Sequence, residues 1–322
     1  MKKSLPKIYS IILTALLLIT ASCGSGGGGS DTPNPPAPSS ALTGANSASV
    51  GGAVITSGSL IVEPTYIGTA DIDSKNIRRP FLISLLSNTI ESIKRNTGIQ
   101  TAGTKDTTTN CTGGGTRREA SQWSGSDSKP ENYTGTITYT NCKEGTETWN
   151  GTVRITYEGL TSAPTKITAA VNITYASTST NTNLTLANAT IEYSDFVYTS
   201  NEITSGNAKL TGSISGTTNG KAINAGYDGF KMSYAYSGNT TQIQMTGKIN
   251  PTCINTWVTV STTTPLTLPT ATACYTAGEM RITDGTNTAS IVFSSNTNVS
   301  VLFNGASVAS YNNCLEVQGL CI

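Results

Sequence analysis

The sequence contains no histidine among its 322 residues. This absence excludes Ser-His-Asp and Cys-His nucleophile systems, a histidine general base and imidazole metal ligands. The chain also lacks a GxSxG nucleophile motif, a phosphate-binding P-loop and a GxGxxG run ahead of a helix. We therefore expect a protein that is not an enzyme and that holds neither a cofactor nor a metal.

Charged residues are scarce as well, at 12% of the chain. The balance is nearly neutral, with 20 basic and 19 acidic residues. A nucleic-acid partner favours a basic patch, so we expect none. Polarity comes instead from Thr, Ser and Asn, a composition typical of strands and turns rather than of surface helices.

The longest apolar run, Ile8 to Ile19, is too short for a membrane-spanning helix, which needs about 20 residues. Lysines precede it and the small residues Ala21-Ser22 follow it, which is the layout of a secretory signal. The sequence Thr20-Ala21-Ser22-Cys23 resembles the lipobox of bacterial lipoproteins, although Thr20 stands where the family usually has Leu. The resemblance implies cleavage after residue 22 and a lipid, including palmitate, on Cys23.

The resemblance also bears on location. Gly24 follows the cysteine, whereas an Asp there often retains a lipoprotein in the inner membrane. The resemblance thus implies an outer-membrane lipoprotein of the cell envelope that faces the periplasm or the cell surface. Cleavage leaves 17 basic and 19 acidic residues, a net charge of −2.

Seven cysteines are an odd number for a secreted chain, and a lipid on Cys23 leaves six to form disulfides. We predict the nearest-neighbour pairs Cys111–Cys142, Cys253–Cys274 and Cys314–Cys321. The alternative is that Cys314 or Cys321 pairs back to the 253–274 region. A metal site is a poor rival, because the chain has no CxxC motif.

Three segments follow from composition and periodicity. Residues 1–22 form the signal peptide, 23–48 form the lipidated cysteine with a flexible Gly/Ser/Pro linker, and 49–322 form a β-rich domain with a sub-boundary near 250. The apolar runs Ala53–Thr56 and Leu60–Glu63 predict the first strands. Helical spacing of apolar residues predicts one helix near 80–95, which we expect to cover part of a sheet.

Residues 100–131 are rich in Thr, Gly and Ser, and we interpret them as a long loop, with at most one strand, pinned by Cys111. From Tyr133 onward, apolar and polar residues alternate with period two, and Gly, Asn and Ser separate the runs. About a dozen such strands must curl, close or split. The fold class is therefore mainly β: an antiparallel meander curled into a half-barrel or sandwich.

The pattern suggests three functions. The first is a lipid-anchored, non-enzymatic binding or surface-structural module, with a protein, glycan or lipid as its unidentified ligand. The second is a carrier or chaperone of a hydrophobic ligand, for which the inner face would supply an apolar groove. The third is a secreted hydrolase that uses carboxylates, such as Asp71 with Asp73. The predicted groove residues are Tyr157, Tyr175, Tyr193, Tyr234, Tyr236 and Phe293.

Overall fold

The computed structural model describes residues 41–61, 101–126, 129–160, 163–179, 181–199, 202–218, 221–269, 274–295 and 298–317. Within these ranges the chain forms one antiparallel sheet with two helices. The elements are α1 (Ser47–Ile61), β1 (Thr101–Asn110), β2 (Thr116–Ser126), β3 (Lys129–Glu144), β4 (Glu147–Leu160), β5 (Ala163–Ser177), β6 (Thr182–Thr199), β7 (Glu202–Thr218), β8 (Lys221–Ser237), β9 (Thr240–Asn250), β10 (Val258–Pro269), β11 (Ala277–Thr283), β12 (Thr288–Phe293), β13 (Val299–Phe303), β14 (Ala306–Tyr311) and α3 (Cys314–Val317).

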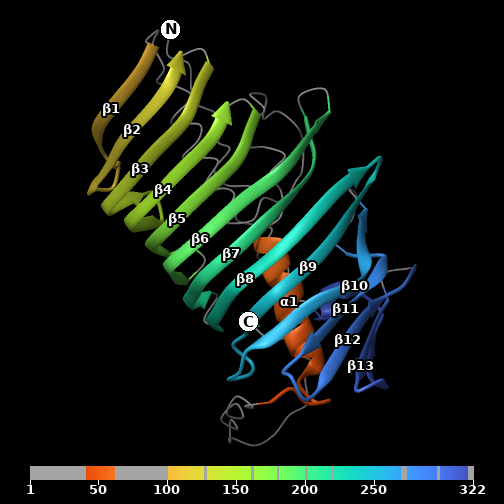
Figure 1. Cartoon of the computed structure of the whole chain (residues 1–322). Helices are drawn as coiled ribbons and strands as arrows, with labels where there is room; N and C mark the ends of the chain where they lie inside the picture. The colour runs from red at the N-terminus through yellow and green to blue at the C-terminus, as the bar shows by residue number, and fades with distance from the viewer. Residues whose placement is uncertain are drawn as a thin grey trace, which may run out of the picture.

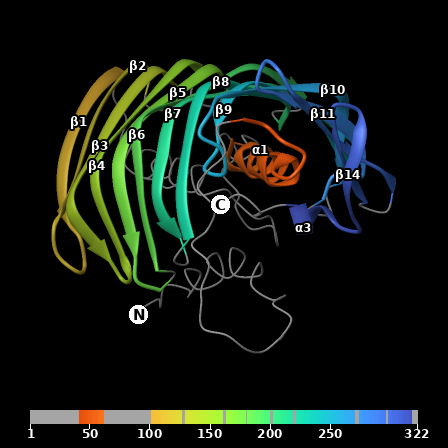
Figure 2. The same cartoon turned by 90° about the horizontal axis from the view of Figure 1, so that it is seen from below.

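The 14 strands are paired in sequence order, from β1 at one edge to β14 at the other. This arrangement confirms the predicted mainly β fold and the antiparallel meander. The sheet curls around its core without closing, as Figure 2 shows from below. It also continues through the sub-boundary expected near residue 250, because Val258 of β10 pairs with Ile249 of β9.

Bulges help the long strands to bend. The pairing register shifts between Tyr139 and Cys142 in β3 and between Ala187 and Thr190 in β6. Asn141 and Asn188 lie at these shifts with φ of 46° and 50°. Asparagine tolerates this left-handed region better than most residues, and an extra residue at a bulge increases the local twist and bends the strand. The asparagines therefore help to turn a meander into a curl.

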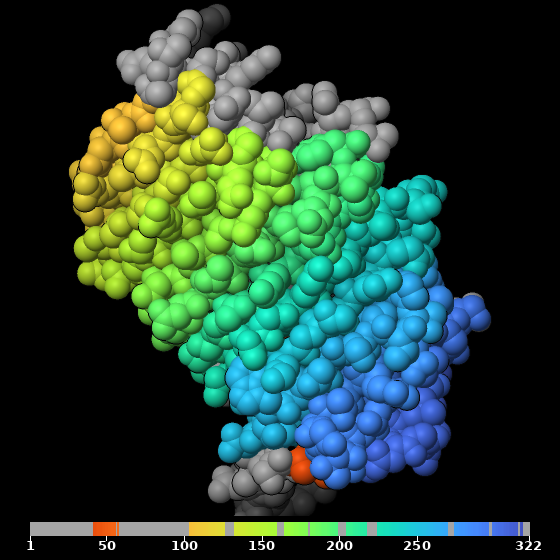
Figure 3. Space-filling model, viewed as in Figure 1, coloured from red at the N-terminus to blue at the C-terminus, as the bar shows by residue number. Residues whose placement is uncertain are grey.

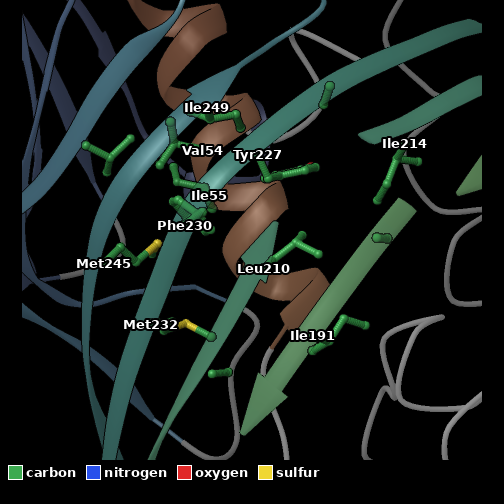
Figure 4. Close-up of a cluster of buried hydrophobic side chains, with 14 of the residues drawn as sticks. Val54, Ile55, Ile191, Leu210, Ile214, Tyr227, Phe230, Met232, Met245 and Ile249 are labelled. Carbon is green, nitrogen blue, oxygen red and sulfur yellow. The ribbon is translucent and has the colours of Figure 1, made fainter. Parts of the chain in front are cut away.

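The first helix lies inside the curl, beneath β7–β9 and against β12 and β13 (Figure 1). Residues Val50 to Ile55 are all buried, so no side of this part of the helix faces water. Figure 4 shows Val54 and Ile55 of α1 beside the inner side chains of the sheet, including Phe230 and Met245. The core of the C-terminal part of the sheet is thus completed by a helix from the start of the chain.

The prediction of strands at Ala53–Thr56 and Leu60–Glu63 was wrong up to Ile61, where the described residues end, since Ala53 to Ile61 belong to α1. The segment has β-branched and Gly residues, which favour strands or turns over helices. A segment enclosed by a sheet face has no neighbouring strand to pair with. It must satisfy its own backbone N–H and C=O groups, and a helix does so. Tertiary burial overrode local propensity.

The folded part also begins earlier than residue 49. Leu42 has no exposed surface, and its N–H donates to Oδ2 of Asp284 at 2.8 Å. Thr43 and Asn46 cap α1 reciprocally: the N–H of Thr43 donates to Oδ1 of Asn46, and the N–H of Asn46 donates to Oγ1 of Thr43. Residues 41–48, assigned from composition to the linker, are therefore structured. The helix predicted near 80–95 lies outside the described residues and stays a prediction.

The interpretation of residues 100–131 as a long loop was also wrong, because β1 and β2 occupy most of it. These strands lie at the edge of the sheet, and their inward side chains include Thr107 and Glu119, which are in line with Ile137 of β3. Apart from Trp123, both faces of this edge are polar, so the sequence shows no sustained apolar alternation. The usual signal for a half-buried strand was missing.

Candidate functional site

The described cysteines confirm one predicted pair and correct the others. Cys111 and Cys142 form a disulfide with a Cα–Cα separation of 5.4 Å. Cys274 pairs with Cys314 at a Cα–Cα separation of 5.5 Å, so the predicted pairs Cys253–Cys274 and Cys314–Cys321 were wrong. Cys253 is also disulfide-bonded. Of the two pairing schemes considered, a return of Cys314 to the 253–274 region is the one observed.

The reason for this error is topological. Cys274 lies just before β11, and Cys314 begins α3, which packs against β14 and α1. The four-strand meander β11–β14 brings its two ends within bonding reach, although 40 residues separate them. Closeness in sequence was a poor guide, because a meander can return the chain to where it started.

The six predicted groove residues all lie in or against the core, but they do not form one groove. Tyr175 lies beside Trp149 with ring centroids 4.3 Å apart, and Phe293 lies beside Tyr275 at 5.1 Å. Both pairs lie away from the remaining four residues, Tyr157, Tyr193, Tyr234 and Tyr236. Five of the six are at most 5% exposed, and Tyr236 is half-buried.

The four remaining tyrosines project from β4, β6 and β8 onto the inner face. Tyr157 and Tyr193 both pair with Ile167 of β5, so one strand separates them. Tyr234 extends across β7, because a Cβ at Gly206 would lie 2.5 Å from the Tyr234 hydroxyl oxygen. Glycine at position 206 therefore lets this ring lie close to the sheet, and Tyr236 packs against it with centroids 5.7 Å apart.

The hydroxyl groups of this cluster are unusual. The oxygens of Tyr157, Tyr193 and Tyr234 are buried and have no hydrogen-bond partner among the described residues. Burial raises the pKa of all three phenols, and for Tyr234 the neighbouring Tyr236, Tyr193 and Tyr198 raise it further. All three stay neutral donors at physiological pH. A buried unsatisfied polar group typically costs about 1–3 kcal/mol.

Sequence reasoning missed a charged pair on the inner face. Arg117 and Glu119 of β2 form an ion pair next to Tyr139 and Ile137 of β3. Burial raises the pKa of the neighbouring Tyr133 to about 12, and it outweighs a hydrogen bond with Ser121 that lowers the pKa. The alternation Arg117, Glu119, Ser121 was the only signal, and it lacked the apolar residues that identify an inward face.

The outer face is mostly polar. Thr136 and Thr138 lie on it, flanking the buried Ile137. A row of directly paired residues crosses the whole sheet on this face without a buried member, and Figure 3 views the molecule from this side. The row consists of Thr104, Gln122, Thr134, Thr156, Thr168, Glu192, Lys209, Lys231, Thr246, Ser261, Arg281, Ser290, Leu302 and Ser307.

The described acidic residues include one cluster with the spacing of metal ligands. Asp71 and Asp73, named for the hydrolase alternative, lie outside the described residues. Cys111, Cys142 and Glu144 are the one cluster with metal-ligand spacing in the described ranges, but the two sulfurs are bonded to each other. Glu144 instead accepts hydrogen bonds from the backbone and hydroxyl of Thr112. This cluster is a pinned turn rather than a metal centre.

Comparison with known proteins gives no relative: no family model matches the chain, and neither does any curated protein or solved structure. In the part of the chain that the structure describes, no helix is both long and apolar enough to cross a membrane.

Proposed function

We propose that this protein is a non-enzymatic binding module of the bacterial cell envelope, tethered to the outer membrane by a lipid on Cys23. The lipobox-like residues 20–23 support the tether, and the odd cysteine count agrees with it. The protein faces the periplasm or the cell surface, and its ligand is a protein, glycan or lipid of that compartment.

The outer face of the sheet is the observation that carries the binding role. It is a mostly polar surface, in register across all 14 strands. A lone sheet with a dry face and a wet face needs its dry face for folding, and its wet face is free to present side chains. Hydroxyl and amide groups dominate the cross-sheet row, which suits recognition by hydrogen bonds rather than by charge.

The tether is tested by Cys23→Ser in cells grown with labelled palmitate. We expect the wild-type protein to carry label and to sediment with membranes, and the variant to lose the label and become soluble. Cys111→Ser together with Cys142→Ser is the control that alters cysteines without touching the lipobox. Label that persists in Cys23→Ser would refute the anchor.

A second candidate, a carrier of a hydrophobic ligand, is favoured by one observation: the unpartnered hydroxyls of Tyr157, Tyr193 and Tyr234 on the apolar inner face. An acyl ester or amide would offer these donors an acceptor in apolar surroundings. A purely structural core has no such use for them.

The triple variant Tyr157→Phe, Tyr193→Phe and Tyr234→Phe separates the two roles, with Tyr311→Phe at a half-buried position as control. For a carrier, native mass spectrometry of wild-type protein from its own cells should show a retained lipid that the triple variant loses. If the inner face is only a structural core, the wild-type protein retains no lipid. Removing the three unpartnered hydroxyls then leaves the free energy of unfolding of the triple variant equal to or higher than that of the wild type.

A further inference from the structure

Trp257 is the one aromatic side chain among the large, exposed apolar residues of the described chain, with 44% of its surface accessible. It lies on the outer face. Ala225 and Tyr227 face the core, so Gly226 between them faces outward, and a Cβ at Gly226 would lie 3.0 Å from Cη2 of Trp257. The indole therefore rests against the polar surface of the sheet and stays open to solvent.

Aromatic rings cover three other sheet glycines, but each of these rings packs in or against the core. Trp123 covers Gly103, Tyr133 covers Gly135 and Tyr234 covers Gly206. Covering a glycine with a ring is a known way to stabilise a strand, and burial of the ring accounts for those three. Burial explains the position of Trp257 less well, because this residue remains 44% exposed.

The loop that carries Trp257 is held at several points. The Oγ1 of Thr252 accepts from the N–H of Asn224 at 2.8 Å and donates to its carbonyl at 2.9 Å. The N–H of Ile254 donates to the carbonyl of Pro251 at 3.2 Å, and the Ile254 side chain is 1% exposed. Cys253 is disulfide-bonded. A fixed platform loses little conformational entropy on binding, which favours a ligand.

The surroundings of the indole are polar and electrically balanced. Gly226 pairs with Ser213 on one side and Asn250 on the other, and Asn224 lies two residues along β8. Asp228, two residues the other way, pairs with Lys248. The other exposed large apolar residues, Val197 and Val308, belong to β6 and β14. A protein partner generally needs a buried core of several apolar residues, and this face has a single ring.

We infer that Trp257 is a stacking platform for a neutral sugar ring of a polysaccharide. The axial C–H groups of a pyranose match the negative face of an indole. Its hydroxyls match the hydroxyl of Ser213 and the amide of Asn224, which both donate and accept. The inference deepens the proposed binding role by naming the ligand class, but it depends only on the outer face and not on the lipid.

The test is titration of the full-length protein, in a detergent without a sugar headgroup, with chitotetraose, cellotetraose and maltotetraose. Binding is followed by calorimetry and by the ¹H–¹⁵N signal of the Trp257 indole. We expect at least one oligosaccharide to bind and to shift that signal. Trp257→Ala should weaken the affinity at least tenfold, Trp257→Tyr should retain part of it, and Val197→Ala should leave it unchanged.

Two results would overturn the inference: no binding of any of the three oligosaccharides by wild-type protein, or equal affinity in Trp257→Ala. Circular dichroism checks that each variant is folded, which is expected because position 257 is exposed. Loss of the membrane tether in Cys23→Ser would not affect this titration, so the two proposals fail separately.

Discussion

The two ends of the sheet complete their cores in different ways. Strands β3–β8 have 14 to 18 residues, and their inner face carries tyrosines with unpartnered hydroxyls. Strands β11–β14 have five to seven residues, and α1 packs inside their curl. The short strands thus form an ordinary apolar core around a helix, whereas the long strands form an inner face with polar groups in it. This difference places the tyrosines proposed for a carrier on the long strands, while α1 fills the space enclosed by β7, β12 and β13.

The largest effect is expected from a charge in the helix core. Val54 of α1 has no exposed surface, so Val54→Asp places a carboxylate in an apolar interior without a partner. We expect a loss of several kcal/mol, enough to prevent stable folding of the C-terminal region. Urea unfolding measures it. Val308→Asp, at a 43% exposed position on β14, is the matched control and should change stability by less than about 0.5 kcal/mol.

The next effect comes from the two disulfides whose cysteines both lie within the described residues. Replacing Cys274 and Cys314 by Ser removes a disulfide that joins residues 40 positions apart in sequence. This should lower the free energy of unfolding by about 2–4 kcal/mol. Hydrogen exchange should show the loss of protection in α1 and β11–β14. The same replacement at Cys111 and Cys142 should instead release β1–β3 at the edge. Equal changes of protection at both ends in both variants would show that the two regions do not unfold separately.

The smallest effect concerns Asp284, which joins the start of the chain to the β11–β12 turn. Burial raises its pKa, but hydrogen bonds from the backbone N–H groups of Asn287, Thr286 and Leu42 outweigh it, so the pKa lies below its usual value. The carboxylate therefore stabilises the fold above its unfolded pKa of about 3.9, and this contribution disappears as the pH falls through the lower folded value.

Asp284→Asn should accordingly lower the free energy of unfolding by about 1 kcal/mol at pH 7, and by progressively less below about pH 4. Thermal unfolding as a function of pH measures it, and Asp106→Asn, an exposed residue paired with Arg118 on β1–β2, is the control. A loss in Asp284→Asn that is independent of pH would mean that the charge has no part in this contact.

Sequence patterns predicted the architecture wherever one strand face is apolar. Ile137, Val153 and Ile167 alternate with polar residues, and all three lie on the inner face. The patterns failed in two settings. At β1–β2 both faces are polar apart from Trp123, so the alternation of residues shows no run of apolar side chains. In α1 the local propensity favoured strands, and only the enclosing sheet made a helix the better conformation.

The candidate sites were predicted unevenly, for similar reasons. Tyrosines at alternate positions could be assigned to an inner face, but their grouping into separate clusters depends on the register, which no local pattern reveals. The same holds for the Cys274–Cys314 pairing, which follows from the return of a meander. Trp257 carried no sequence signal, because its position on the outer face depends on Gly226 of β8, a residue distant in sequence.

We propose that this β domain is a binding module held at the envelope by a lipid on Cys23. The most direct measurement is the intact mass of the protein purified from its own cells. We expect a chain that begins at Cys23, carries a diacylglyceryl mass and has lost six hydrogens to three disulfides. A chain with an unmodified Cys23 thiol, or one that begins at another residue, would contradict it.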